Sequence, residues 1–310
     1  MAKYDFDIGV IGGGAAGLTV TAGAAQLGAR TLLVEKEKTL GGDCLHYGCV
    51  PSKTLISTAR VYHLMNNADK FGLPRSLFPS VDYREVAKRI QSVIDTIQRH
   101  DSEERFCSMG ADVKFGSPFF VDEHSIQLDG NRYSAKNWVI ATGSSPGIPP
   151  IDGLDKIHYI TNKEIFSLNH LPRSLIILGA GPIAIEMAQA FSRLGSNVTV
   201  VQRSGQILSK EDRDMADEVM KVMISERVSF HLNASVLSTK DLGSEKEIVI
   251  KTKDGKTVKI KSEMILVAMG RKPNLEGLGL ENIGVVFDRN GIQVDNRLKT
   301  AHKHIYAAEM

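Results

Sequence analysis

The sequence has few of the features that would tie it to a membrane, to nucleic acid or to the cell exterior. No apolar run approaches the roughly 18 residues that a membrane span needs. The first residues lack the apolar core and small-residue cleavage site of a signal peptide. The formal charge of +2 is too small to indicate a surface for nucleic acid or lipid. We therefore expect a cytoplasmic protein with no membrane or nucleic-acid partner.

Cysteine is also scarce, with three residues in a chain of 310. So few cannot form the disulfide framework of a secreted protein, and in a reducing compartment a close pair such as Cys44 and Cys49 is more often catalytic or metal-binding. A zinc site would want four ligands, and His46 is the only other obvious one nearby. A structural disulfide closing so small a loop would stabilise little. Redox catalysis is thus favoured for the pair, while Cys107 is expected to be a structural bystander near a helix end.

The first glycine-rich segment is typical of a dinucleotide-binding turn. A short apolar strand ends at Gly12, a helix of small residues follows, and a second strand ends at Glu35. In such a unit Gly12 permits the tight turn, Gly14 lets the backbone approach a pyrophosphate, and Gly17 lets the helix pack closely on the strand. The phosphates then face the helix N-terminus. Glu35 stands where a carboxylate accepts bonds from a ribose hydroxyl pair.

A second glycine-rich segment repeats this design. Gly12 and Glu35 are 23 positions apart, as are Gly179 and Gln202. Each round continues with short antiparallel strands and an apolar strand that is closed by a glycine. The repeat predicts two α/β nucleotide-binding domains in tandem, each with a small antiparallel insertion.

The two rounds differ where they would meet a ribose. The first has the carboxylate of Glu35, followed by Lys36, whereas the second has the amide of Gln202, followed by Arg203. A carboxylate repels a 2′-phosphate, while an amide tolerates it and a guanidinium pairs with it. The second site therefore favours NADPH, although Gln202 would also bond a ribose hydroxyl of NADH.

Between the first fingerprint and its antiparallel strands, the apolar spacing predicts two helices, over about 53–66 and 83–106. Their apolar stripes are interpreted as core. Short strands follow from residue 112, with a hairpin turn at Asp129-Gly130. A separate buried strand is expected over 138–141.

The cysteine-bearing segment resembles the redox motif of class I pyridine nucleotide-disulfide oxidoreductases. The resemblance rests on residues 41–44 (Gly-Gly-Asp-Cys) and 48–53 (Gly-Cys-Val-Pro-Ser-Lys), with residues 141–143 and 270–274 matching further family motifs in the expected order. It covers nearly the whole chain and lies nearest to mercuric reductases and dihydrolipoamide dehydrogenases. The fold that it implies is a tandem of three-layer FAD/NAD(P)-binding Rossmann-like domains with small antiparallel β insertions.

The resemblance also assigns the cofactors and domains. FAD is expected in a discontinuous domain of residues 1–147 and 271–310, and NADPH or NADH in residues 148–270. A hydride would pass from the nicotinamide through the flavin to the disulfide, and on to a small-molecule disulfide or metal ion.

In the same family, the residue matching Cys49 contacts the flavin and the residue matching Cys44 exchanges with substrate. The lysine matching Lys53 lies against the flavin and pairs with a glutamate, for which Glu186 has the right position. No metal ligands are expected. The remaining candidates share an expected contact with a cofactor: for FAD they are Gly12, Gly14, Ala15, Ala16, Gly17, Glu35, Lys36, Gly41, Gly42, Asp43, Lys53, Gly116, Ser117, Ala141, Thr142 and Gly143, and for the nicotinamide cofactor Gly179, Gly181, Pro182, Ile183, Gln202, Arg203 and Gly270.

The end of the chain departs from the family pattern. Residues 304–308 resemble the strand that leads into a Gly-Asp flavin motif, but Glu309 and Met310 follow instead. The family's C-terminal dimerisation domain, which supplies a His-Glu acid/base pair across a homodimer, is not in the sequence. General acid-base groups contribute roughly 10²–10⁴-fold to rate, so we expect a truncated and impaired enzyme. The alternative is a truncated nucleotide-binding module without turnover.

Overall fold

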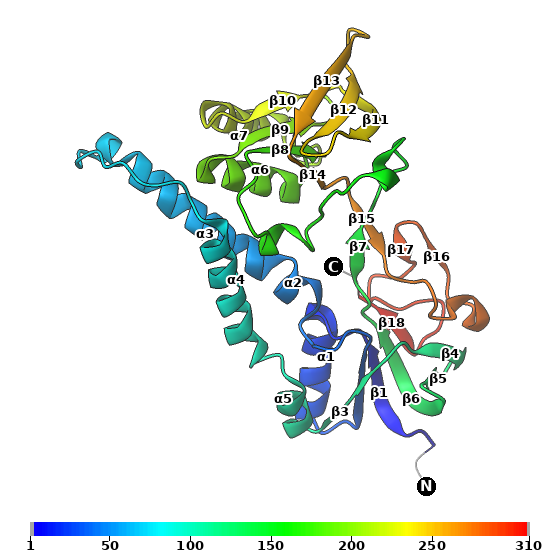
Figure 1. Ribbon diagram of the computed structural model, residues 1–310. Helices are drawn as coiled ribbons and strands as arrows, with labels where there is room; N and C mark the ends of the chain where they lie inside the picture. The colour runs from blue at the N-terminus through cyan, green and yellow to red at the C-terminus, as the bar shows by residue number, and fades with distance from the viewer. Residues whose placement is uncertain (1–2, 309–310) are drawn as a thin grey trace. The chain divides into compact units, whose positions relative to one another are not determined.

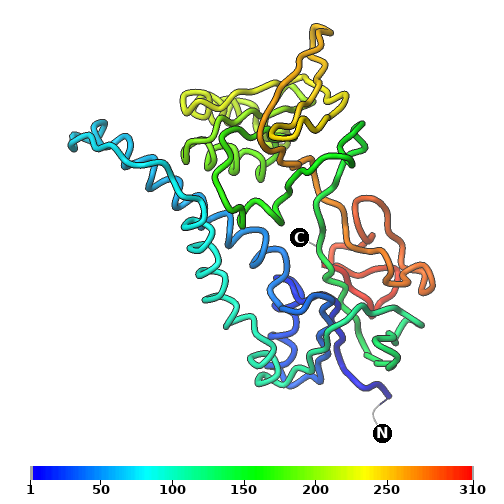
Figure 2. The backbone as a smooth tube through the Cα atoms, in the orientation of Figure 1, coloured from blue at the N-terminus to red at the C-terminus, as the bar shows by residue number. Residues whose placement is uncertain are grey.

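The computed structural model describes residues 3–308 and shows two compact units (Figure 1). The first contains the chain up to Gly48, residues 94–145 and the chain from Arg271 onward. The second contains Cys49–Val93 and Pro146–Gly270. Blue, green and red segments, far apart in the sequence, lie side by side in the sheet of the first unit (Figure 2).

The first unit is organised around a parallel sheet with strand order β3-β2-β1-β6, and β18 pairs with the free side of β6. These strands are β1 (Phe6–Ile11), β2 (Thr31–Glu35), β3 (Ala111–Phe115), β6 (Asn131–Ile140) and β18 (Ile305–Ala307). All five residues of β2 are buried, as expected for a strand covered on both faces. The topology is that of a Rossmann-like domain, so the predicted fold class is confirmed.

An antiparallel extension leaves this sheet through the first half of β6. β4 (Phe119–Asp122) pairs with β5 (Ser125–Leu128), and β5 pairs with β6 across the turn at Asp129 and Gly130. Both turn residues have positive φ, as the Asp-Gly pair predicted. The separate strand expected over 138–141 is wrong, because residues 131–140 form one continuous strand whose two halves pair with different neighbours.

Three helices accompany the sheet of the first unit: α1 (Ala15–Gln26), α2 (Gly42–His46) and α5 (Glu103–Ser108). α1 packs against β1, β2 and β3, and its apolar side chains share a buried cluster with Val10, Leu33 and Phe106. A second cluster surrounds Trp138, which is fully buried. These two apolar clusters hold the strands in place and so position the turns at the carboxyl ends of the strands.

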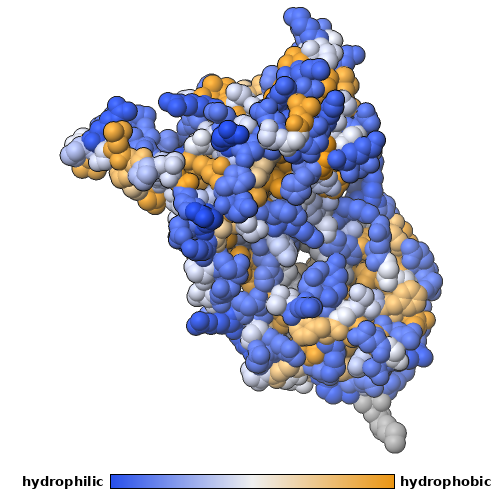
Figure 3. Space-filling model, viewed as in Figure 1, coloured by the Kyte–Doolittle hydropathy of each residue, from blue (hydrophilic) through white to orange (hydrophobic). Residues whose placement is uncertain are grey.

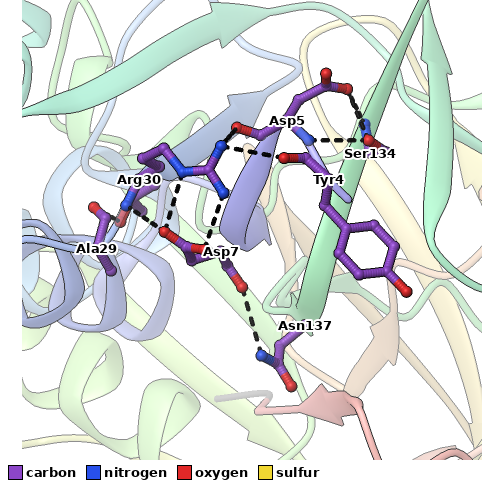
Figure 4. Close-up of polar contacts among 8 residues, drawn as sticks. Tyr4, Asp5, Asp7, Ala29, Arg30, Ser134 and Asn137 are labelled. Carbon is purple, nitrogen blue, oxygen red and sulfur yellow. Dashed lines mark hydrogen bonds and ion pairs between the residues drawn. The ribbon is translucent and has the colours of Figure 1, made fainter. Parts of the chain in front are cut away.

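Polar contacts fix the start of β1 against its neighbours (Figure 4). Arg30 donates to both carboxylate oxygens of Asp7 and to the backbone carbonyls of Tyr4 and Asp5. Asp5 in turn accepts from the amide and hydroxyl of Ser134 on β6. Because a shift of one residue would place the apolar side chains of β1 on the wrong face, these contacts add to the register that the core imposes.

The second unit repeats the same architecture. Its parallel sheet has the order β10-β9-β8-β14, and a three-stranded antiparallel sheet, β11-β12-β13, forms the insertion. The strands are β8 (Ser174–Leu178), β9 (Asn197–Val201), β10 (Ser229–His231), β11 (Ser235–Asp241), β12 (Lys246–Lys251), β13 (Thr257–Ser262) and β14 (Met264–Val267). The helices α6 (Pro182–Leu194) and α7 (Arg213–Ser225) belong to this unit. The predicted tandem repeat is confirmed.

A helical hairpin, α3 (Cys49–Asn66) followed by η1 (Ala68–Phe71) and α4 (Tyr83–Gln98), starts in the second unit. Residues 49–93 pack there rather than with the remainder of the expected FAD domain, because α3 lies on α6 and the buried ring of Tyr83 stacks on Phe191. Val61 and Phe71 are among the exposed apolar side chains of this segment. Figure 3 shows orange, hydrophobic surface on the same segment.

The helix expected over 83–106 is wrong as one element. α4 ends at Gln98, and α5 starts anew at Glu103 with Ser102 as its N-cap, whose hydroxyl accepts from the Arg105 amide at 3.3 Å. The remaining short elements are β7 (Ser144–Pro146), β15 (Arg271–Pro273), β16 (Phe287–Asp288), β17 (Gly291–Ile292), η2 (Leu154–Lys156), η3 (Ile165–Ser167) and η4 (Leu280–Ile283). Within residues 3–308, no helix combines the length and apolar character that crossing a membrane requires.

Candidate active site

The two glycine turns have the same geometry in the two units. Gly12 has φ of 107° and Gly179 has φ of 104°. A Cβ on Gly12 would lie 2.2 Å from the carbonyl oxygen of Ala141, and one on Gly179 would lie 2.3 Å from that of Ala268. Only glycine fits such a backbone so close to a neighbouring strand. Glycine is therefore required at both positions, because the turn passes close to the backbone at the end of the neighbouring parallel strand.

In the first unit, Gly14 is the N-cap of α1 and has no side chain to bond the first-turn amides. Ala15 and Ala16 form that first turn and are half-buried. A Cβ on Gly17 would lie 1.8 Å from the carbonyl oxygen of Gly12, which explains the close packing of helix on strand. The amides at this helix N-terminus suit a phosphate group.

Glu35 ends β2 with a buried carboxylate. One oxygen accepts from the Gly13 amide at 2.6 Å, and the other accepts from the Glu37 amide at 2.8 Å. Each carboxylate oxygen can accept a second bond, so a ribose hydroxyl pair can donate to the same group. The glutamate thus both fixes the glycine turn and keeps acceptor capacity for a ligand.

A cavity of about 480 Å³ opens beside Glu35. Its volume is in the usual range for cofactor and small-molecule sites. The predicted residues Gly12, Glu35, Lys36, Ser117 and Thr142 line it, and further lining comes from Ile11, Val34, Pro118, Ser145 and the segment 272–278. The hydroxyl oxygen of Thr142 is buried without a hydrogen-bond partner, as expected for a group whose partner is a ligand. These observations fit the adenosine half of FAD.

Other predicted residues lie behind this lining. The Gly116 amide donates to the Glu35 carbonyl at 2.8 Å, and the Ala141 amide donates to the Ile11 carbonyl at 2.7 Å. Gly143 accepts from the Asn274 amide at 2.9 Å. They shape the strand ends, and residues 272–278 complete the cavity wall. Residues 272–274 belong to a segment that the sequence marked only as a family motif, and residues 275–278 carried no signal.

The cysteine segment lies directly on the first glycine turn. The Gly41 amide donates to the Gly13 carbonyl at 2.8 Å, and a Cβ on Gly42 would lie 2.6 Å from the Cα of Gly14. Gly42 starts the short helix α2, which carries Cys44 in a half-buried position. The two glycines are therefore explained by the close approach of two backbones.

The structure contains no disulfide between the three cysteines of the chain. Cys44 is half-buried, while Cys49 and Cys107 are exposed, and each is a free thiol. Cys107 lies in the last turn of α5, as predicted. Among residues 3–308, no three histidine, cysteine, aspartate or glutamate side chains are grouped to hold a metal ion.

Asp43, next to Cys44, forms an ion pair with Arg271 at 3.1 Å. Arg271 also donates to the hydroxyl of Ser144 at 2.8 Å and to its carbonyl at 2.5 Å. Three residues on, Asn274 donates from its side chain to the Thr142 carbonyl at 2.9 Å. The segment after Gly270 is thus fastened both to the cysteine segment and to residues 142–144.

In the second unit, the N-cap of α6 is Gly181, and Pro182 occupies the first turn. Proline is favoured there because its missing N–H has no partner in the first turn anyway. Pro182 and Ile183 are exposed, as is Arg203, while Nε2 of the Gln202 side chain donates to the Ser204 hydroxyl at 2.7 Å. Gly270, at the unit's end, has φ of 125° and accepts from the Gly147 amide.

Lys53 on α3 forms an ion pair with Glu186 on α6, so the expected pairing of these two side chains is confirmed. Both residues border a cavity of about 220 Å³ in the second unit, together with Arg193. Arg193 is held in a fork by Glu226, at 2.6 and 2.9 Å. The Lys53–Glu186 pair joins α3 to α6 and orients the Lys53 side chain, and the Arg193–Glu226 pair joins α6 to the end of α7.

The chain is similar to known proteins over nearly its whole length. The sequence model of the pyridine nucleotide-disulphide oxidoreductase family matches residues 6–308. The chain is 33% identical over 307 residues to a mercuric reductase of Bacillus cereus, covering 99% of this chain and 48% of the relative. It is 34% identical over 316 residues to a dihydrolipoyl dehydrogenase of Bacillus subtilis (strain 168), covering 98% and 66%.

A solved structure, the HOCl-induced flavoprotein disulfide reductase RclA from Escherichia coli, matches with a TM-score of 0.85 at 27% identity, covering 97% of this chain and 65% of that one. The chain spans about half the length of the mercuric reductase and just under two thirds of the other two. Members of the matched family use FAD and NAD(P)H, as the resemblance implied. The chain belongs to the pyridine nucleotide-disulphide oxidoreductase family.

Proposed function

We propose that this chain is the nucleotide-binding part of a disulfide oxidoreductase that uses FAD and NADPH or NADH. The first glycine turn and its cavity would hold FAD, and the second turn would hold the nicotinamide cofactor. Cys44 and Cys49 would form the redox-active pair. The acceptor would be a small-molecule disulfide or a metal ion, the two classes that the names of dihydrolipoyl dehydrogenase and mercuric reductase relatives indicate.

The observation that supports this proposal most directly is the contact between the cysteine segment and the first glycine turn. Gly41 and Gly42 rest on Gly13 and Gly14, so Cys44 is anchored within a few residues of the expected phosphate site. A structural or zinc-binding pair would gain nothing from this position. A redox pair needs it, because electrons must reach the sulfur from a bound flavin.

Different residues of the first unit would bind different parts of FAD. The turn from Gly12 to Gly17 would receive the pyrophosphate, and Glu35 would accept from the ribose. Thr142 would satisfy its buried hydroxyl on the ligand, and the segment 272–278 would close the cavity. When bound, FAD supplies the chemistry that accepts a hydride from the nicotinamide and delivers two electrons to a disulfide.

The cysteines carry out the exchange that follows. The hydride brings two electrons and one proton, and solvent supplies the second proton, so that the Cys44–Cys49 disulfide becomes two thiols. The Cys44 thiolate then attacks the acceptor disulfide and releases one thiolate. Cys49 next attacks the Cys44 sulfur, which releases the second thiolate and restores the original bond. Such exchange requires thiolates, so nearby positive charge promotes it.

Lys53 would supply positive charge beside the flavin, as its counterpart does in the family, and Glu186 would hold it in place. For the nicotinamide site we propose a preference for NADPH, supported by Gln202 and Arg203 in place of a glutamate. We also propose the cytoplasm as the compartment and a homodimer as the state of the full-length enzyme. The scarcity of cysteine supports the first, and the family resemblance supports the second.

The test is to purify the full chain, reconstitute it with FAD and add NADPH without oxygen. We expect a yellow protein whose flavin absorbance falls on addition of NADPH and returns when a disulfide is added. Cys49→Ser should keep FAD but lose disulfide reduction. Cys107→Ser is the matched control, because Cys107 lies on α5 outside the cysteine segment, and it should behave as the parent chain.

The two alternatives give different results. A chain that binds FAD and NADPH but passes no electrons to a disulfide would be a nucleotide-binding module without turnover. Loss of FAD from Cys49→Ser would indicate a structural role for the pair. Either result would overturn the proposed reaction.

A further inference from the structure

The negative charge of Asp43, next to Cys44, is unfavourable for the thiolate that the proposed exchange reaction needs. Asp43 precedes Cys44 on the first turn of α2, and a negative charge on the neighbouring residue opposes formation of a thiolate. Asp43 is not left alone, however, since one of its oxygens lies 3.1 Å from the guanidinium of Arg271. The segment therefore brings a negative charge to the thiol and a positive charge that compensates it.

Arg271 is itself held rigidly. It donates from Nε to the Ser144 hydroxyl at 2.8 Å and from Nη2 to the Ser144 carbonyl at 2.5 Å. Its side chain is about a quarter exposed, so its position does not depend on a flexible surface contact. A planar guanidinium can serve a carboxylate and a carbonyl at once, which a lysine cannot do with the same geometry.

The backbone beside the pair is equally constrained. A Cβ on Gly48 would lie 2.9 Å from the Asp43 carbonyl and 3.2 Å from both the Asp43 carboxylate and the Cα of Cys44. The turn that ends the cysteine loop thus closes over Asp43 and Cys44 together. A change in the orientation of the Asp43 side chain would therefore alter the surroundings of Cys44.

We propose that Arg271 is a positioning residue for Cys44, which compensates the charge of Asp43 and fixes the start of α2. This inference rests on the proposed redox role of the cysteines and adds the residue that keeps the outer thiol reactive. Other titratable groups near this segment are His46 on α2, Tyr47 at its C-cap and, through His46, Asp101. The cation that forms an ion pair with the Asp43 carboxylate is Arg271.

The test measures the reactivity of Cys44 alone, in a Cys49→Ser, Cys107→Ser background. The rate of alkylation by iodoacetamide, an uncharged reagent, is followed from pH 6 to 10 without flavin or nicotinamide. Arg271→Gln should move the midpoint of this profile upward by about half to one pH unit, because the Asp43 charge is then uncompensated. Asp43→Asn should move it downward by a similar amount, and the double variant should return close to the parent.

Opposite shifts separate this role from a structural one, because loss of local structure would move both single variants in the same direction. The matched control is Arg132→Gln, which removes an exposed ion pair with Asp122 in the same unit and should leave the profile unchanged. Trp138 fluorescence checks that each variant is folded. Unchanged midpoints, or shifts of one sign in both variants, would overturn the inference. The assay needs no cofactor, so its result is independent of whether the chain turns over.

Discussion

Lys53 and Glu186 are 133 positions apart in the sequence, and their side chains form an ion pair between α3 and α6. Both residues belong to the second compact unit. Lys53 is more than half exposed, and exposed pairs contribute only about 0–1 kcal/mol to stability. The pair is therefore better explained by the position that it gives to the lysine than by the stability that it gives to the fold.

This relationship leads to the first prediction. Lys53→Met should slow the reduction of bound flavin by NADPH by about tenfold or more, because preorganised charge at a reacting group contributes that much. The free energy of unfolding should change little. Glu186→Gln should have a smaller effect in the same direction, since the lysine keeps its charge but loses its anchor. Stopped-flow absorbance of the flavin measures both.

The control for this experiment is Lys70→Met, which removes an exposed lysine from η1 in the same unit. It should reduce its flavin at the parent rate. A parent rate in Lys53→Met would contradict the role of Lys53, and an equal loss in Lys70→Met would show that general charge, rather than position, matters.

The second prediction concerns the turn at Gly179. Gly179→Ala should weaken nicotinamide binding and destabilise the second unit by about 2 kcal/mol or more, because the new Cβ would lie 2.3 Å from the Ala268 carbonyl and φ is 104°. FAD binding should be retained. Gly243→Ala is matched to it, since φ there is 88° but no atom lies within 4 Å of the added Cβ.

Gly243→Ala should cost only the backbone strain, about 1 kcal/mol, and should leave nicotinamide affinity unchanged. Urea unfolding followed by circular dichroism and NADPH titration measure the two effects. Equal behaviour of the two variants would show that the close approach to Ala268 is unimportant.

The third prediction concerns the choice between nicotinamide cofactors. Arg203→Gln should lower affinity for NADPH by about tenfold or more and leave affinity for NADH nearly unchanged, because a charged hydrogen bond to a 2′-phosphate contributes about 1.5–3 kcal/mol. Arg213→Gln, at an exposed arginine on α7, should affect neither. A parent chain that prefers NADH would overturn the NADPH assignment without touching the proposed flavin site.

Local patterns predicted the parts of this structure that depend on local geometry. The turns at Gly12 and Gly179 and the hairpin at Asp129 follow from backbone conformations that few residues adopt, and the sequence therefore marks them. The spacing of Glu35 and Gln202 follows from the length of one βαβ unit. These turns and spacings depend on the local sequence and not on contacts with distant parts of the chain.

Local sequence patterns did not predict the contacts between segments that are far apart in the chain. Nothing between Cys49 and Val93 shows that the hairpin packs with the second unit, since that depends on contacts such as Tyr83 on Phe191. The helix expected over about 53–66 starts four residues earlier, at Cys49, since proline is tolerated in the first turn. Likewise, no local signal placed residues 272–278 in the wall of the cavity.

The last prediction concerns pH and a group of histidines in the first unit. The rings of His124 and His304 stack at 4.0 Å, and His302 lies at 5.9 Å from His304. Burial lowers the pKa of His304, and the neighbouring His124 and His302 lower it further against the opposing effect of Glu123. The folded chain therefore binds a proton at His304 less readily than the unfolded chain does.

The sign of the effect follows by linkage. Stability from the neutral ring is fully present above the unfolded pKa of about 6.5 and is lost as pH falls towards the lowered folded pKa. His304→Gln should therefore reduce the loss of stability between pH 7 and 5, whereas His100→Gln, at an exposed position of the same unit, should not. Trp138 is the only tryptophan, and its amide donates to the His304 carbonyl at 2.8 Å, so urea unfolding followed by its fluorescence reports on this region. An unaltered pH dependence in His304→Gln would show that acid sensitivity arises elsewhere in the unit.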